Sequence, residues 1–147
     1  MHIVFEGPDS VGKSTQIKLT KTYLESLGKV VTLTREPGGT ELGLALRTIL
    51  LESSLEISPR AEALMMASDR AQDVQEIIVP ALDRSEIVIS DRFIPSSLVY
   101  QGIVRGLGID KVLDLSLFAL DGHTVDLTLC FDLEDELAIE RTDKNPD

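Results

Sequence analysis

The sequence lacks several features that would point to particular classes of protein. It contains a single cysteine, Cys130, so no disulfide can form within the chain. Cations are scarce: 14 Lys and Arg residues stand against 25 Asp and Glu, and the formal net charge of −11 disfavours a nucleic acid or an anionic membrane as the partner. No apolar run approaches the ~20 residues that span a bilayer. We therefore expect a cytoplasmic protein.

The few potential metal-binding or redox side chains are expected to be structural. Cys130 lies inside the apolar run 127–131, which predicts a buried thiol in a strand. His2 and His123 lack metal-ligand spacing and are expected to be core or solvated residues. With 147 residues, 43% of them hydrophobic, the chain is large enough to bury a core, and we expect one domain over 1–147.

A phosphate-binding pattern follows the first apolar run. Residues 7–15 read G-P-D-S-V-G-K-S-T, which matches G-x-x-x-x-G-K-[ST]. The two glycines stand where a side chain would block the phosphate or where φ must be positive. The lysine can reach the β- and γ-phosphate oxygens, and the next serine can ligate Mg²⁺. The pattern predicts a nucleoside triphosphate site made of Gly7, Pro8, Asp9, Ser10, Val11, Gly12, Lys13, Ser14 and Thr15.

Short apolar, β-branched runs alternate with stretches of helical periodicity along the chain. This alternation predicts an α/β fold of three layers, a parallel sheet with helices on both faces. Ligands of such folds bind outside the carboxyl ends of the strands. Strands are expected at 3–5, 30–33, 87–89 and 127–131, and helices at 13–27, 41–51, 59–82, after Pro95, at 110–120 and at 134–141.

An acid and a cation follow the third expected strand. Asp91 ends an apolar run, where a carboxylate can lie near the Mg²⁺ of a phosphate-loop enzyme. The alternative is an aspartate that caps a turn. Arg92 comes next and can bind phosphate oxygens.

Two further arginines add to this positive charge. Arg35 precedes the turn E-P-G-G-T, where the alternative is a plain βα turn with a surface arginine. Arg70 lies within a helix, where the alternative is an arginine that faces solvent. With Lys13 and Arg92, these residues exceed what one triphosphate requires, so they predict a second, phosphorylated substrate.

Several segments together resemble the thymidylate kinase family, nucleoside monophosphate kinases that act on deoxythymidine monophosphate (dTMP). The resemblance spans essentially the whole chain. It implies a magnesium-dependent transfer of the ATP γ-phosphoryl group to dTMP, giving the diphosphate for dTTP biosynthesis, by a homodimer that uses ATP and Mg²⁺. The segments are F-E-G-P-D-S-V-G-K-S-T (5–15), T-R-E-P-G-G-T (34–40), A-S-D-R-A-Q (67–72), D-R-F-I-P-S-S-L-V-Y-Q-G (91–102) and V-D-L-T-L (125–129).

The resemblance also implies roles for individual residues. Asp9 would approach the acceptor sugar, Arg92 would clamp the acceptor phosphate, and Asp91 with Ser14 would hold Mg²⁺. Arg70 would hydrogen-bond a thymine carbonyl. The catalytic set implied is Lys13, Asp91, Arg92 and Asp9, and the substrate set is Arg35, Pro37, Met66, Arg70, Arg92, Ser97, Tyr100, Gln101 and Arg105.

The sequence departs from the family pattern in three respects. Met66 replaces a phenylalanine that stacks on thymine, although methionine can also pack on a ring. Ser10 and Val11 stand where one branch has an arginine, so the transition-state cation is expected from a lid that begins after Arg141. The 147 residues end just where that lid should begin, and the family's last strand and final helices are absent from them.

Two other functions stay open at this stage. One is a regulatory module that binds nucleotide on a kinase-like fold without catalysis. The other is a kinase for a different nucleotide or for a deoxynucleoside, although paired arginines favour an acceptor that already carries a phosphate.

Overall fold

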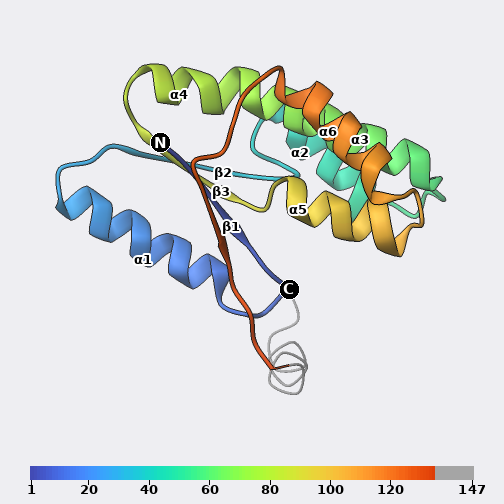
Figure 1. Cartoon of the computed structure of the whole chain (residues 1–147), viewed down its shortest axis with the longest axis horizontal. Coiled ribbons are helices and arrows are strands. Elements are labelled where there is room, and N and C mark those ends of the chain that lie inside the picture. The colour runs from blue at the N-terminus through green and yellow to red at the C-terminus, as the bar shows by residue number, and fades with distance from the viewer. Residues whose placement is uncertain (135–147) are drawn as a thin grey trace.

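A four-stranded parallel sheet forms the centre of the molecule in the computed structural model, which describes residues 1–134. The strand order is β2-β3-β1-β4, and helices cover both faces (Figure 1). The predicted α/β fold with a parallel sheet between helical layers is confirmed. The strands are β1 (His2–Glu6), β2 (Val31–Arg35), β3 (Ile87–Asp91) and β4 (Leu127–Cys130).

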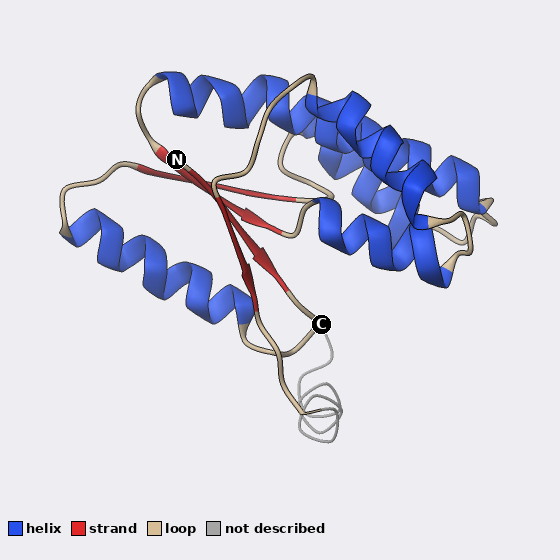
Figure 2. Cartoon of the chain, viewed as in Figure 1, coloured by secondary structure: helices blue, strands red, loops and turns tan. Residues whose placement is uncertain are grey.

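Five helical stretches connect the strands or precede β4; the helices are blue in Figure 2. Three of these stretches contain a π-helical segment. The predicted helix over 41–51 is α2 followed by a π-helical segment, and the one over 59–82 has a π-helical segment in its middle. The predicted helix over 134–141 lies outside the described residues. The elements are α1 (Lys13–Ser26), α2 (Glu41–Arg47), η1 (Thr48–Glu52), α3 (Pro59–Asp73), η2 (Val74–Ile78), α4 (Val79–Asp83), α5 (Ile94–Ser97), η3 (Leu98–Val104) and α6 (Ile109–Leu120), with η marking the π-helical segments.

Alternate residues of the central strands enter two separate cores. Val4 and Val88 pack with Ile78 of η2 on one face, whereas Phe5 and Ile89 pack with side chains of α1 on the other. Since successive side chains of a strand point to opposite faces, a strand covered on both faces must be apolar throughout. This explains the continuous apolar runs of β1 and β3.

The parallel register brings several sequence motifs to one edge of the sheet. Asp91 is opposite both Phe5 of β1 and Arg35 of β2. The loops after these three strands therefore leave the sheet side by side. Sequence order reverses at β1, which lies between β3 and β4, and ligands of open α/β sheets bind at such a switch point.

The expectation for Cys130 was wrong in part. The residue is in a strand as predicted, but its thiol is exposed because β4 forms the edge of the sheet and all four of its residues are exposed.

The expectation of a core histidine is confirmed for His2, which is fully buried. Its Nδ1 lies 2.9 Å from Nε2 of His123. Burial, together with His123, lowers the pKa of His2 to about 4.

No helix in the described part of the chain is both long enough and apolar enough to cross a membrane.

Candidate functional site

A cavity of about 510 Å³ opens at the carboxyl edge of the sheet. Its lining joins the predicted phosphate loop to residues that follow β2 and β3. Lys13, Arg35 and Arg92 from the sequence-based prediction meet there, and the described part of the chain adds a fourth cation, Arg47. The lining residues are Asp9, Ser10, Gly12, Lys13, Ser14, Thr15, Arg35, Glu36, Arg47, Asp91 and Arg92.

The phosphate loop has the backbone that its glycines were predicted to allow. Gly12 has φ +98° and immediately precedes α1, so the positive end of this 14-residue helix faces the cavity. Gly7 has φ +138°, and a Cβ there would lie 2.3 Å from the carbonyl oxygen of Phe131. Gly7 is thus required both by conformation and by the close approach of the segment after β4.

Lys13 folds over the inside of this loop. Its Nζ donates hydrogen bonds to the carbonyl oxygens of Gly7 (2.9 Å) and Pro8 (2.6 Å). The side chain is buried, and burial, reinforced by the charge of Arg92, lowers the pKa of its ammonium. The ammonium is therefore close to where a phosphate would lie and weakly hydrated, which strengthens its attraction for an anion.

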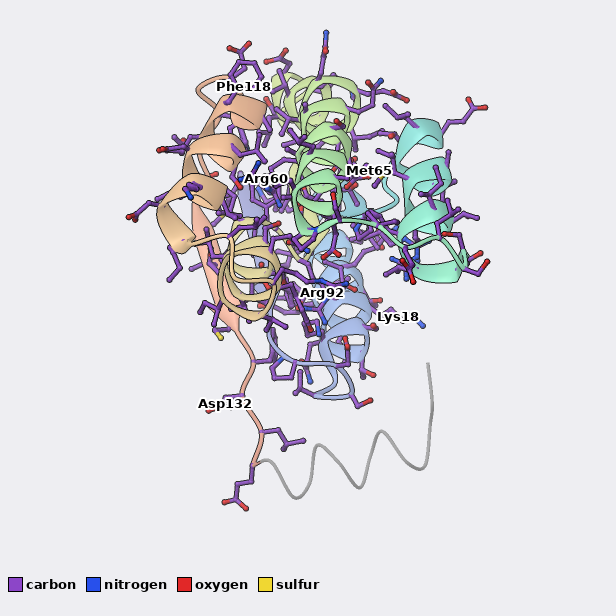
Figure 3. The ribbon with its side chains drawn as sticks, turned by 90° about the vertical axis from the view of Figure 1, so that its right-hand side faces the viewer. Lys18, Arg60, Met65, Arg92, Phe118 and Asp132 are labelled. Carbon is purple, nitrogen blue, oxygen red and sulfur yellow. The ribbon has the colours of Figure 1, made fainter. Side chains whose placement is uncertain are left out.

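Asp91 and Arg92 lie at the end of β3, as predicted. Oδ1 of Asp91 is buried and has no hydrogen-bond partner among the described residues, although the side chain lines the cavity. Arg92 forms an ion pair with Asp9 of the phosphate loop, and its guanidinium lies 5.7 Å from the ring centre of Tyr100. In Figure 3, Arg92 is located between α1 and α5.

Arg35 and Arg47 flank Gly38 in the turn after β2. A Cβ on Gly38 would lie 3.2 Å from Cδ of Arg47 and 3.3 Å from Nε of Arg35. Nη1 of Arg47 also donates to the carbonyl oxygen of Pro37 at 3.0 Å. The turn therefore holds two guanidinium groups against the cavity, and sequence reasoning found only the first of them.

Arg70 is buried and does not face solvent. Its guanidinium donates to Oε2 of Glu36 from Nε (3.0 Å) and Nη2 (2.7 Å), and to the hydroxyls of Ser97 and Ser116 at 3.0 and 2.9 Å. The alternative of a solvent-facing arginine is wrong, because the partner that stabilises the buried charge comes from the β2 turn, 34 residues earlier. The predicted substrate residues Arg70 and Ser97 are thus brought together.

Three buried carboxylates surround the base of this turn. Burial raises the pKa of Glu36, and the Arg70 guanidinium opposes that shift. Asp69 accepts a hydrogen bond from the backbone N–H of Gly38 (3.0 Å), and burial raises its pKa as well. Asp73 accepts from the Thr34 hydroxyl (2.6 Å), and burial with the charge of Asp69 raises its pKa to about 7.

The other predicted substrate residues lie outside the cavity lining. Gln101 donates from Nε2 to Glu62 at 2.9 Å, and Arg105 forms an ion pair with the same carboxylate at 2.9 Å. Met66 is half-buried on α3, one turn before Arg70. The structure thus brings Lys13, Asp91, Arg35 and Arg92 together at the cavity. Arg70, Arg105 and the predicted base-binding residues lie outside its lining.

Sequence reasoning missed Glu6, Glu36 and Arg47. Glu6 and Glu36 lie within the quoted segments 5–15 and 34–40, and the signal was a carboxylate at the end of an apolar strand or directly after an arginine. Arg47 carries no such signal, since an arginine in the last turn of a helix is common on helix surfaces.

Comparison with known proteins agrees with this geometry. A family model described as thymidylate kinase matches residues 5–147. The chain belongs to the thymidylate kinase family. A thymidylate kinase from Leifsonia xyli is 48% identical over 141 residues, which cover 96% of this chain and 67% of the relative. A thymidylate kinase from Geobacillus sp. is 45% identical over 142 residues, which cover 96% of this chain and 68% of the relative.

A solved structure of a family member has the same fold. The crystal structure of thymidylate kinase from Ehrlichia chaffeensis superposes with a TM-score of 0.84 and 34% sequence identity, covering 99% of this chain and 88% of that one. The chain thus has the P-loop kinase fold of the thymidylate kinases, and it spans about two thirds of the length of the two curated relatives.

Proposed function

We propose that this chain catalyses the magnesium-dependent transfer of the ATP γ-phosphoryl group to dTMP, giving dTDP for dTTP biosynthesis. The observation that carries the proposal is that one cavity is lined both by the phosphate loop and by Arg35, Arg47 and Arg92. A phosphoryl transfer needs two phosphates placed in line and cations distributed over the transferring group. Membership of the thymidylate kinase family identifies the acceptor.

ATP would occupy the loop at the start of α1. The backbone N–H groups of the loop and the positive end of α1 favour the negative charge of the triphosphate. Lys13 donates to two carbonyl oxygens of its own loop, and phosphate oxygens at this place would compete with those neutral acceptors for the ammonium. A charged acceptor makes the stronger hydrogen bond.

The residues that would hold Mg²⁺ fit the ion. Ser14 and Asp91 both line the cavity, and Oδ1 of Asp91 is a buried oxygen without a partner in the described chain. No cluster of three or more His, Cys, Asp or Glu residues that could hold a metal occurs within residues 1–134, so the remaining ligands would be phosphate oxygens and water, as Mg²⁺ prefers. When bound, Mg²⁺ supplies positive charge to the β- and γ-phosphate oxygens.

The acceptor phosphate would lie among the three cavity arginines. Arg92 is 18% exposed and Asp9 is 64% exposed, so this ion pair lies at the mouth of the cavity. Asp9 is then placed to meet the sugar of a monophosphate whose phosphate binds Arg92. Arg35 and Arg47 approach from the β2 turn, and a planar guanidinium can bind a phosphate with two parallel hydrogen bonds.

The thymine base would be recognised by the residues around α3 and η3. Arg70 is held by Glu36, Ser97 and Ser116, which accept from four of its five N–H donors, so one N–H of Nη1 is left for a base carbonyl. Met66, Pro37, Tyr100 and Gln101 supply the remaining surface in this proposal, and Arg105 adds positive charge beyond them.

A homodimer is part of the proposal, because helices α2, α3 and α6 expose large apolar side chains. Phe118 of α6 is 86% exposed and lies on the outer surface (Figure 3). Leu44 of α2, Leu64 of α3 and Leu117 of α6 are each at least half exposed. Helix α3 packs against both α2 and α6, and exposed apolar side chains on neighbouring helices are suited to an interface between subunits. Because ATP and dTMP are cytoplasmic metabolites, we place the enzyme in the cytoplasm.

A coupled assay of ADP release across the nucleoside monophosphates tests the function. We expect turnover with ATP and dTMP to exceed that with every other monophosphate and with deoxynucleosides. Binding of ATP and dTMP without ADP release would instead support a nucleotide-sensing module. Greater turnover with another acceptor would show that the base site is misassigned.

A further inference from the structure

Glu6 is a buried carboxylate that the proposed chemistry does not use. It ends β1 and is 4% exposed. Its Oε1 accepts hydrogen bonds from the backbone N–H groups of Phe93 (2.8 Å) and Ser96 (3.2 Å). Its Oε2 accepts a third bond from the Ser96 hydroxyl (2.6 Å). One side chain of β1 therefore fixes the segment that leaves β3.

Ser96 connects this carboxylate to Arg92. The Ser96 Oγ donates to Glu6 and accepts a hydrogen bond from Nη1 of Arg92 at 3.0 Å. Its single proton is directed to Glu6, so an oxygen lone pair is left to receive the guanidinium. Glu6 thereby determines which way the Ser96 hydroxyl points. This hydroxyl in turn holds the Nη1 side of the Arg92 guanidinium.

The backbone of Arg92 needs such support. Its φ is +70°, a conformation that a residue with a side chain adopts only where the surrounding structure imposes it. The backbone N–H of Arg92 donates to the carbonyl oxygen of Phe5 (2.9 Å), and the next N–H donates to Glu6. Consecutive amides on both sides of the strained residue are thus held by the last two residues of β1.

We infer that Glu6 is a positioning residue: through Ser96 and the Phe93 amide it holds Arg92 in the orientation that binds the acceptor phosphate. The inference rests on the proposed function, which assigns Arg92 to that phosphate. It explains why α5, which has no side-chain cap on its own N-cap residue, receives its capping carboxylate from β1. Glu6 itself touches no substrate in this account.

A double-mutant cycle distinguishes positioning from a general structural role. Glu6→Gln keeps the shape of the side chain but replaces one carboxylate oxygen by an NH₂ group. This group donates hydrogen bonds, so it cannot accept the proton of the Ser96 hydroxyl. We expect this variant to bind dTMP at least tenfold more weakly by calorimetry, with its ATP affinity changed less than twofold. In an Arg92→Ala background the same substitution should have no further effect on dTMP, because the residue through which it acts is absent.

Asp73→Asn is the matched control. Asp73 is also a fully buried carboxylate that accepts a hydroxyl hydrogen bond, and it makes no contact with residues 91–96 among its hydrogen bonds. Its substitution should leave the dTMP affinity within twofold. Ser96→Ala provides a second route if Glu6→Gln does not fold, because it removes only the hydroxyl between Glu6 and Arg92 and should weaken dTMP binding in the same selective way.

The possible outcomes are separable from failure of the proposed function. If the unaltered protein does not bind dTMP, the proposed function is wrong. If it binds dTMP, two results would show that Glu6 is only structural. One is that Glu6→Gln, or Ser96→Ala in its place, weakens the binding of ATP and of dTMP equally. The other is that the substitution weakens dTMP binding as much in the Arg92→Ala background as in the unaltered protein. Unchanged dTMP affinity in a folded variant also overturns the inference.

Discussion

Nη2 of Arg70 lies 2.7 Å from Oε2 of Glu36, and the two side chains are 1% and 0% exposed. This buried ion pair joins α3 to the turn after β2, which carries Arg35 towards the cavity. The removal of one partner from a buried ion pair typically costs ~3–5 kcal/mol, because the other charge is left without compensation. The pair therefore has consequences for folding that can be measured apart from catalysis.

Arg70→Leu should destabilise the protein by about 3 kcal/mol or more near neutral pH, as for other broken buried pairs. Without the guanidinium, burial alone acts on Glu36 and raises its pKa further. A carboxyl group whose pKa is raised on folding stabilises the folded state at low pH and loses that contribution as the pH rises. The unaltered protein keeps Glu36 protonated up to a pKa of about 8, so the destabilisation should grow as the pH rises through and above about 8 in urea unfolding.

Two further variants support the interpretation of the Arg70 experiment. Arg60→Leu changes an exposed arginine of the same helix and should alter stability by less than ~0.5 kcal/mol. Adding Glu36→Gln to Arg70→Leu should recover part of the loss at pH 8. A pH-independent loss, or no recovery, would show that packing rather than charge compensation dominates at this site.

Lys13→Ala should abolish phosphoryl transfer and lower the melting temperature little. Lys13 is buried, and its ammonium donates to two loop carbonyls. Pro8 is exposed and Gly7 is partly exposed, so their carbonyls can accept bonds from water instead and the structural cost is small. Turnover and thermal unfolding should be measured together.

Lys18→Ala is the control for Lys13, since Lys18 is exposed on the same helix and points outward (Figure 3). It should keep full activity. Turnover that survives Lys13→Ala in a folded protein would contradict the assignment of Lys13 to the triphosphate.

Met66→Phe should keep or improve the preference for dTMP over uridine monophosphate. A phenyl ring can stack on thymine, and aromatic pairs contribute about 0.5–1.5 kcal/mol beyond their buried area, a gain of up to about tenfold in affinity. The ratio of kcat/KM for the two monophosphates measures the effect. An increase in affinity for a purine monophosphate instead would mean that the base pocket is misplaced.

Asp73→Asn should flatten the pH dependence of stability. The pKa of Asp73 is raised from 3.8 to about 7 in the folded protein, so between about pH 4 and 7 the folded state binds more protons than the unfolded state and stability falls as the pH rises. Asparagine cannot titrate and keeps an oxygen for the Thr34 hydroxyl. Relative to the unaltered protein, the variant should gain on the order of 2 kcal/mol between pH 5 and 8.

The lowered pKa of His2 produces the opposite slope between about pH 4 and 6.5, since the folded state there binds fewer protons. It is common to both proteins and cancels in their difference. Parallel stability curves for Asp73→Asn and the unaltered protein would contradict the raised pKa of Asp73.

The arrangement of strands and the phosphate loop could be predicted because their signals are local. Apolar runs such as β3 show directly that a strand is covered on both faces, and the glycines at 7 and 12 stand where the loop requires positive φ. The carboxyl ends of parallel strands share one edge, so Arg35 and Asp91 could be expected to lie together.

The partners of buried charges could not be predicted, because they are distant in sequence. Arg70 is neutralised by a residue 34 positions away, and Glu6 receives its donors from residues about 90 positions away. Periodicity shows that a residue lies on a helix face but not which side chain meets it. The exposure of Cys130 likewise depends on the place of β4 at the edge of the sheet, which strand composition does not reveal.

The most direct test of the account is the fate of the terminal phosphoryl group of ATP. The protein should be incubated with ATP labelled in the γ-phosphate, with dTMP and with Mg²⁺, and the nucleotides should be separated chromatographically. We predict that the label appears in dTDP and that chelation of Mg²⁺ prevents this transfer. Lys13→Ala and Arg92→Ala should each reduce the rate of transfer by at least a hundredfold, which corresponds to about 2.7 kcal/mol of transition-state stabilisation. Label that appears only in inorganic phosphate, or in a nucleotide other than dTDP, would contradict the proposed reaction.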